Sequence, residues 1–143
     1  MLIEGKCHCG NVLLELEWPE SAPEIPARAC GCSFCVKHGG VWTSNPNAAL
    51  KVAIQSGAKV SKYVFATQTA TFHICSRCGV VPFVTSEVNG RSYAVVNVNV
   101  LEGIDQSSLR RTPANFEGED IENRLTRRTR NWIPNVSILE AGA

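Results

Sequence analysis

The most informative stretch of this sequence is Cys30-Gly31-Cys32-Ser33-Phe34-Cys35. It places three thiols within six residues, and no fourth thiol lies in the same run. Zinc in proteins favours four ligands in a tetrahedron, so three protein sulfurs leave one position open for water or a substrate. The stretch therefore predicts a zinc site at which chemistry can take place.

The other four cysteines form two close pairs, Cys7 with Cys9 and Cys75 with Cys78. A glycine follows each pair, and glycine adopts the positive φ angles that turn backbone N–H groups toward the sulfurs. Both pairs are expected on turns beside strands. Together they would supply a closed four-sulfur structural site that ties the amino-terminal strand to the middle of the chain. The seven cysteines thus divide into four and three.

Length and composition indicate an ordinary globular protein. The chain has 143 residues, of which 44% are hydrophobic and 19% charged, and we interpret it as one domain spanning residues 1–143. Its formal net charge of +1 argues against nucleic-acid binding. Residues 1–6 lack the pattern of a signal peptide, and no apolar run has membrane-spanning length. We expect a cytoplasmic protein without a membrane partner, in which clustered thiols serve metal or redox chemistry rather than disulfides.

Apolar and polar side chains alternate along much of the chain, which predicts an antiparallel sheet of short strands. Asn89-Gly90 is the strongest hairpin motif in the sequence. Strands are expected at residues 12–18, 41–44, 50–54, 60–65, 69–74, 80–85 and 91–100. The segments expected outside the sheet are a proline-containing loop at 18–26, about one helical turn at 36–40, a polar connection at 103–118, and a short helix at 119–130.

These motifs resemble the glutathione-dependent formaldehyde-activating enzyme and centromere protein V domain family. The resemblance rests on C-x-C-G near the start, C-x-C-x-x-C about twenty residues later, a glycine pair after it, and C-x-x-C-G in the middle. It covers residues 2–101, with a weaker similarity at Trp132. In one position the chain departs from the family, because it has Gly31 where many members have histidine.

The resemblance implies an all-β fold of the Mss4-like kind with two zinc ions. It also implies roles for the cysteines. Those carried over as ligands of the structural zinc are Cys7, Cys9, Cys75 and Cys78, and those carried over as ligands of the catalytic zinc are Cys30, Cys32 and Cys35. The activity it implies is that of a carbon–sulfur lyase, similar to S-(hydroxymethyl)glutathione synthase, acting on glutathione and formaldehyde or a related small aldehyde.

Three thiolate ligands favour this chemistry over hydrolysis. Zinc with three thiolates carries a formal charge of −1, so it is a weak generator of hydroxide but remains a good acceptor for a further thiolate. Coordination deprotonates a thiol, whereas a free thiol with a pKa near ~8.5 is only slightly ionised at neutral pH. The open position is therefore expected to bind and activate a thiol such as glutathione.

Nearby cations could offset the charge that a fourth thiolate would add. The candidates are Lys37, His38 and Arg77. For Lys37 and Arg77 a solvated surface charge is the favoured alternative, whereas His38 fits either interpretation.

Three further side chains and one basic run are candidates for the site. His8 could be a ligand, but Cys7 and Cys9, which flank it, are available as ligands and are favoured over it. His73 is interpreted as a hydrogen-bonded strand histidine rather than a catalytic base, and Trp42 as either the floor of the open site or ordinary core. The basic run containing Arg127, Arg128 and Arg130 could receive glutathione carboxylates, although a solvated helix end is the favoured interpretation.

Two further functions remain open at this stage. In the first, both zinc ions are structural and the protein is a zinc-stabilised binding module without catalysis. In the second, oxidation joins two of the three clustered thiols and releases the metal. The fourth ligand of the three-cysteine site distinguishes the first of these from the enzyme, because a protein side chain there would close the tetrahedron.

Overall fold

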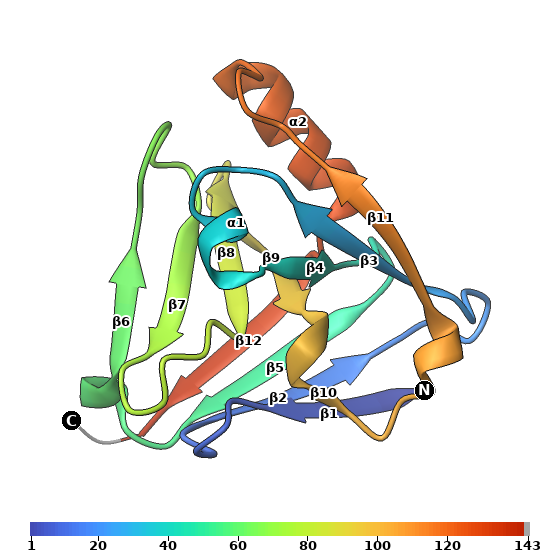
Figure 1. Cartoon of the computed structure of the whole chain (residues 1–143), viewed down its shortest axis with the longest axis vertical. Helices are drawn as coiled ribbons and strands as arrows, with labels where there is room; N and C mark the ends of the chain where they lie inside the picture. Colours follow the sequence, from blue (N-terminus) through green and yellow to red (C-terminus); the bar gives the residue numbers. More distant parts are fainter. Residues whose placement is uncertain (142–143) are drawn as a thin grey trace.

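The computed structural model, which describes residues 1–141, contains two β-sheets and two short α-helices (Figure 1). The first sheet has the strand order β10-β1-β2-β5-β12. Its pattern of alternating burial is clearest in β2, which buries Val12, Leu14 and Leu16 and exposes the residues between them. Its strands are β1 (Leu2–Lys6), β2 (Val12–Glu17), β5 (Ala49–Ile54), β10 (Leu101–Glu102) and β12 (Asn135–Glu140).

The second sheet has the order β11-β3-β4-β9-β8-β7-β6. The hairpin between β8 and β9 turns at Asn89 and Gly90, with φ angles of 53° and 78°, so the predicted hairpin is confirmed. The strands of this sheet are β3 (Ile25–Cys30), β4 (Val41–Thr43), β6 (Val60–Tyr63), β7 (Thr71–Cys75), β8 (Phe83–Val88), β9 (Arg91–Asn97) and β11 (Leu109–Ala114).

The second sheet is apolar on both faces. Consecutive residues of a strand point to opposite sides, so Phe83 and Val96 enter the main core between the sheets, whereas Val84 and Val95 enter a second cluster on the far side. That second cluster also contains Trp132, which follows α2. The far face of the sheet is therefore covered by its own group of apolar side chains, and this face carries the candidate site.

The two helices have clear local causes. The first, α1 (Cys35–His38), ends at Gly39, whose φ of 73° is the left-handed conformation that glycine adopts most easily. The second, α2 (Ile121–Asn131), begins after Asp120, whose side chain accepts a 2.8 Å hydrogen bond from the backbone N–H of Asn123. Both helices lie where the sequence predicts them, and the predicted mostly β fold with a short carboxyl-terminal helix is confirmed.

The structure differs from the sequence prediction at β3, which begins within the loop expected at 18–26, and at two sheet edges. The segment expected to be a polar connection contains β11, which pairs in parallel with β3, and β12 pairs in parallel with β5. Most residues of both strands are exposed, so neither strand shows apolar alternation. Pro113 is compatible with β11 because β11 is an edge strand, where a missing backbone N–H can be tolerated. The remaining ladders are antiparallel, as predicted.

Within residues 1–141, no helix is both long and apolar enough to cross a membrane.

His73 of β7 is buried and held by its neighbours. Its side chain is 6% exposed, its ring stacks on Phe83 with centroids 4.2 Å apart, and its Nε2 lies 2.8 Å from Thr85 Oγ1. Burial, and then the charge of Lys62, lower the pKa of His73 to about 4. This is the hydrogen-bonded strand histidine that the sequence predicts.

We predict that His73 makes the fold sensitive to acid. A folded-state pKa below the unfolded value of about 6.5 gives stability that is present above pH 6.5 and is lost as the pH falls toward 4. The free energy of unfolding of the wild type should fall by about 2 kcal/mol more between pH 7 and pH 5 than that of His73→Gln. Chemical denaturation of both proteins measures this difference, in which the effects of other titrating groups cancel. Equal pH dependence of the two would contradict the prediction.

A second prediction concerns Gly5, where β1 passes close to the chain before β10. A Cβ atom at this position would lie 2.8 Å from the backbone oxygen of Val100, which cannot move independently. Gly5→Ala should therefore lower the free energy of unfolding by about 1–3 kcal/mol, although alanine is otherwise better than glycine in a strand. Lys6→Ala, exposed on the same strand, is the control. An unchanged or higher denaturation midpoint for Gly5→Ala would show that the strand can shift.

Candidate metal centres and the adjoining pocket

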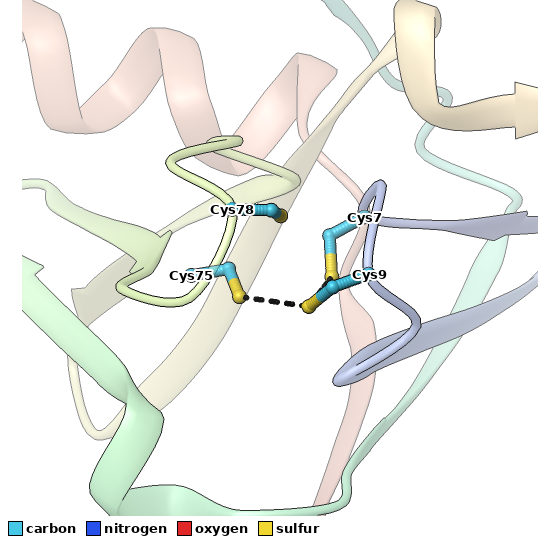
Figure 2. A group of neighbouring side chains, drawn as sticks. All are labelled: Cys7, Cys9, Cys75 and Cys78. Carbon is cyan, nitrogen blue, oxygen red and sulfur yellow. Dashed lines mark hydrogen bonds between the residues drawn. The ribbon is translucent and has the colours of Figure 1, made fainter.

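The four-cysteine cluster brings together two turns that belong to different sheets. Figure 2 shows the side chains of Cys7 and Cys9 pointing toward those of Cys75 and Cys78. The first turn follows β1, the second follows β7, and the glycines Gly10 and Gly79 take φ angles of 84° and 82°. The two turns use the same local design, with the N–H of each glycine donating to the carbonyl of the first cysteine.

The spacing of these sulfurs fits a tetrahedral metal ion. All four lie within 4.8 Å of one another, with Sγ–Sγ distances of 3.7 Å for Cys7–Cys9 and 3.5 Å for Cys9–Cys75. Zinc–sulfur bonds of about 2.3 Å in a tetrahedron place sulfurs about 3.8 Å apart. A disulfide needs about 2.05 Å, and all seven cysteines are free. The cluster can therefore hold a metal ion, and thiolates are donors that suit zinc.

The three-cysteine cluster lies where β3 passes into α1. The sulfurs of Cys30, Cys32 and Cys35 lie within 4.8 Å of one another. The backbone N–H of Cys35 donates to Cys32 Sγ at 3.3 Å, and Trp42 Nε1 donates to Cys35 Sγ at 3.4 Å. Both sulfurs therefore accept hydrogen bonds from N–H groups of the protein. This cluster also fits a metal ion, with one sulfur fewer than the first.

Glycine is required behind this cluster. A Cβ atom on Gly40 would lie 2.9 Å from Trp42 Nε1 and 3.1 Å from Cys35 Sγ. Any larger side chain would displace the sulfur or its hydrogen-bond donor. The glycine pair that the sequence places after the cluster thus has two separate functions, since Gly39 ends the helix and Gly40 leaves room for the sulfur.

The thiols of this cluster share protons unequally. A hydrogen bond from Cys35 is the main cause that lowers the pKa of Cys30 to about 6, and the charge of Arg127 acts in the same direction. The pKa of Cys35 is raised, because Cys35 donates to Cys30 and is buried. A metal ion binds cysteines as thiolates, so metal binding would release the retained proton.

The fourth position of this cluster is not filled by another protein ligand. Over the described residues, no histidine, aspartate, glutamate or further cysteine places a ligand atom with the three sulfurs. His8 is exposed and lies in the other turn, outside the four-sulfur group. An additional ligand in the open position would therefore come from solvent or substrate.

A pocket of about 330 Å³ opens beside the three cysteines. All three cysteines line it, and Trp42 forms part of its wall, so Trp42 both lines the site and belongs to the apolar cluster. Aromatic side chains make up much of the remaining wall, namely Phe65, Phe72, Phe116 and Trp132. The pocket is thus largely apolar, with thiols at one side.

Four arginines complete the lining, and we call them the arginine wall: Arg28, Arg124, Arg127 and Arg128. For Arg128 the predicted solvated helix end is wrong, because its side chain is only 5% exposed. Its Nη1 donates to Thr69 and Ser86, and its guanidinium lies over the ring of Trp132. Burial, and then repulsion from Arg127 and Arg124, lower the pKa of Arg128 to about 10. Arg128 lies on the face of α2 that packs against the sheet, and it is therefore buried.

The neighbouring arginines differ in their partners. Arg127 forms a salt bridge with Glu119 at 3.0 Å and lies 3.6 Å above the ring of Phe116. Arg28 donates to Ser44 Oγ at 2.6 Å, and Ser44 donates in turn to the backbone at the end of α2. These two hydrogen bonds attach α2 to β3, the strand that carries Cys30.

The remaining candidates lie on the surface. Lys37 and Arg77 are exposed, as expected for solvated charges, and Arg130 is also exposed. His38 is exposed, and its ring packs against Phe34 with centroids 4.5 Å apart. Partial burial lowers the pKa of His38, which makes it a poor permanent cation near the cluster.

The pocket is also lined by Arg28, Phe116 and Glu119, which no motif in the sequence indicates as site residues. Arg28 could have been found, because it lies two residues before Cys30 on a strand and therefore on the same face. Phe116 and Glu119 belong to the segment between β11 and α2, and no local pattern in the sequence indicates that this segment folds over the pocket.

Comparisons with known proteins agree with this geometry. The profile of the family described as glutathione-dependent formaldehyde-activating enzyme matches residues 2–117. A Halomonas elongata protein, provisionally named glutathione-dependent formaldehyde-activating enzyme, is 33% identical over 85 residues, which are 54% of this chain and 52% of that protein. The match thus spans about half the length of that relative.

A crystal structure of a Rhodobacter sphaeroides protein is similar in fold. It is 30% identical in sequence and superimposes with a TM-score of 0.56. The alignment covers 77% of this chain and 97% of the Rhodobacter sphaeroides chain. The family profile, which matches well over half of the chain and includes both cysteine clusters, decides the assignment. The chain belongs to the glutathione-dependent formaldehyde-activating enzyme family.

Proposed function

We propose that this protein is a zinc-dependent carbon–sulfur lyase that joins a thiol, glutathione, to formaldehyde or a related small aldehyde. The observation that carries the proposal is the three-cysteine cluster, which faces a pocket and receives no fourth ligand from residues 1–141. A closed binding module would have a complete tetrahedron at both clusters. The family membership and the named relative support the same chemistry.

The two clusters are proposed to have different functions. Cys7, Cys9, Cys75 and Cys78 would hold a structural zinc between the sheets, and Cys30, Cys32 and Cys35 a catalytic zinc at the pocket. We further propose one zinc domain spanning residues 1–143, because α2 and β12, which follow the matched residues, pack on the same two sheets. Seven free thiols suit a reducing compartment such as the cytoplasm.

When bound to the three thiolates, zinc supplies deprotonation of an incoming thiol. The chain's own residues maintain the conditions for this step. Trp42 Nε1 and the N–H of Cys35 donate to the cluster sulfurs, which stabilises their negative charge. The positive charge of Arg127 acts on Cys30 in the same direction. The aromatic lining limits access of water.

The proposed reaction is balanced without any redox partner. A carbon–sulfur bond forms between the thiolate and the aldehyde carbon, and the carbonyl π electrons move to oxygen. The proton released by the thiol is transferred to that oxygen, which gives a hemithioacetal; with formaldehyde this is the S-hydroxymethyl derivative of the thiol. In the reverse direction the carbon–sulfur bond breaks, which is the lyase reaction.

The direct test is zinc content together with glutathione titration on protein purified without chelator. We expect about two zinc ions per chain and binding of glutathione, with formaldehyde consumed faster than in the same glutathione solution without protein. S-Methylglutathione, which has no ionisable thiol, is the matched ligand and should bind more weakly. About two zinc ions with no preference for the free thiol would instead favour the binding module.

Two cysteine variants should separate the clusters. Cys32→Ser should reduce zinc from about two ions to about one, abolish glutathione binding and leave cooperative unfolding intact. Cys78→Ser should abolish cooperative unfolding, because binding of a structural zinc contributes directly to the free energy of folding. Zinc analysis, circular dichroism and thermal denaturation of both variants measure this contrast. Equal loss of fold in both would contradict the division into structural and catalytic clusters.

A further inference from the structure

The arginine wall contains a buried cation that lacks a negatively charged partner. Arg128 is 5% exposed, its hydrogen bonds go to Thr69 and Ser86, and its guanidinium lies over the ring of Trp132, so its contacts within residues 1–141 are uncharged. A buried charge left without a counter-ion costs free energy, so such groups are usually paired. Arg128 lines the pocket, and a ligand there could supply the missing counter-ion.

The neighbouring residues of the pocket do not supply a counter-ion for Arg128. Arg28 donates to a serine hydroxyl, and Arg124 donates to the backbone carbonyls of Phe116 and Glu119, so both have uncharged partners. Glu119 is committed to Arg127 through both of its carboxylate oxygens. Glu117, the other carboxylate of the lining, is exposed. An excess of positive charge therefore remains, even with a zinc–trithiolate centre of formal charge −1 at the cysteines.

The rest of the pocket is suited to an apolar group. Its volume of about 330 Å³ far exceeds the two heavy atoms of formaldehyde, and aromatic rings form much of its wall. A hydrocarbon or aromatic body would gain free energy from burial against such a wall. Pockets of this size bind whole organic molecules.

We infer that the pocket binds an organic acid whose apolar or aromatic body fills the aromatic recess and whose carboxylate is held by Arg128 and Arg28. The inference rests on the proposed function only in placing the reacting end of the acid, an aldehyde, at the three cysteines. Binding of the acid itself requires the arginine wall and the recess, not the zinc. The natural substrate is then larger and more apolar than formaldehyde.

The test uses acids that cannot react. We would titrate 3-phenylpropionate and hexanoate, and separately their uncharged amides, into the zinc-containing protein by calorimetry. Each acid should bind at least tenfold more tightly than its amide, because hydrogen bonds between a guanidinium and a carboxylate are strengthened by charge. Equal affinity for acid and amide would overturn the inference.

Variants then assign the preference to the arginine wall. Arg28→Met should lower the affinity for the acids about tenfold and leave that for the amides unchanged. Glu119→Gln should raise the affinity for the acids several-fold, because it frees Arg127, whereas a purely structural function of these residues cannot tighten binding. Arg130→Met, which removes an exposed charge from the same helix, is the matched control and should change neither affinity. Arg128→Met would be interpreted only if its thermal unfolding matches that of the wild type.

The same titrations separate this inference from the lyase proposal. In Cys32→Ser, glutathione binding should be lost while the preference for acids over amides persists. If wild-type protein shows the acid preference but no reaction of glutathione with formaldehyde, the lyase proposal fails and the acid site stands. If Arg28→Met and Glu119→Gln both leave acid affinity unchanged, the acid site fails and the lyase proposal is unaffected.

Discussion

Four sulfur atoms, two from a turn of each sheet, lie within 4.8 Å of one another and connect the two sheets. Cys9 and Cys75 are 66 residues apart in sequence, yet their sulfurs lie 3.5 Å apart. Closing so long a loop costs chain entropy, and four thiols without a metal ion repay little of it, since thiols form only weak hydrogen bonds. A bound metal would supply the missing free energy. The apolar core between the sheets, to which Cys7 and Cys75 also belong, is the second connection between them.

The second sheet connects the four-cysteine cluster to the pocket. Its strands bury one set of side chains in the main core and the alternate set beneath the pocket, as Phe83 and Val84 illustrate. The same alternation on β3 places Arg28 and Cys30 on one face, where cation and thiol line the same cavity. The three-cysteine cluster therefore needs no separate framework. Its position is determined by β3, by the single turn of α1, and by the donor from Trp42 on β4.

The sequence is informative wherever one residue type at one spacing has a single physical use. Cysteine spacing predicts both clusters, Asn89-Gly90 predicts the hairpin, and Gly39 predicts the end of α1. It is uninformative where position depends on distant contacts. β11 and β12 are exposed edge strands, so their pairing partners and not their own side chains make them strands. The burial of Arg128 likewise depends on Thr69 and Ser86, which no pattern within α2 can reveal.

The second helix shows how the pocket is assembled at some cost to stability. Arg124, Arg127 and Arg128 are three and four residues apart, so their charges lie on one face and repel one another. Glu119 and backbone carbonyls offset part of this repulsion, and the ring of Phe116 supports Arg127. The remainder acts on Arg128, whose pKa is lowered to about 10 by burial and by these neighbours. Leucine in place of Arg128 would suit a purely structural helix better, because it would add to the apolar cluster without a charge to desolvate. A cation kept there at such a cost is most simply explained by an anion that occupies the pocket when the protein works.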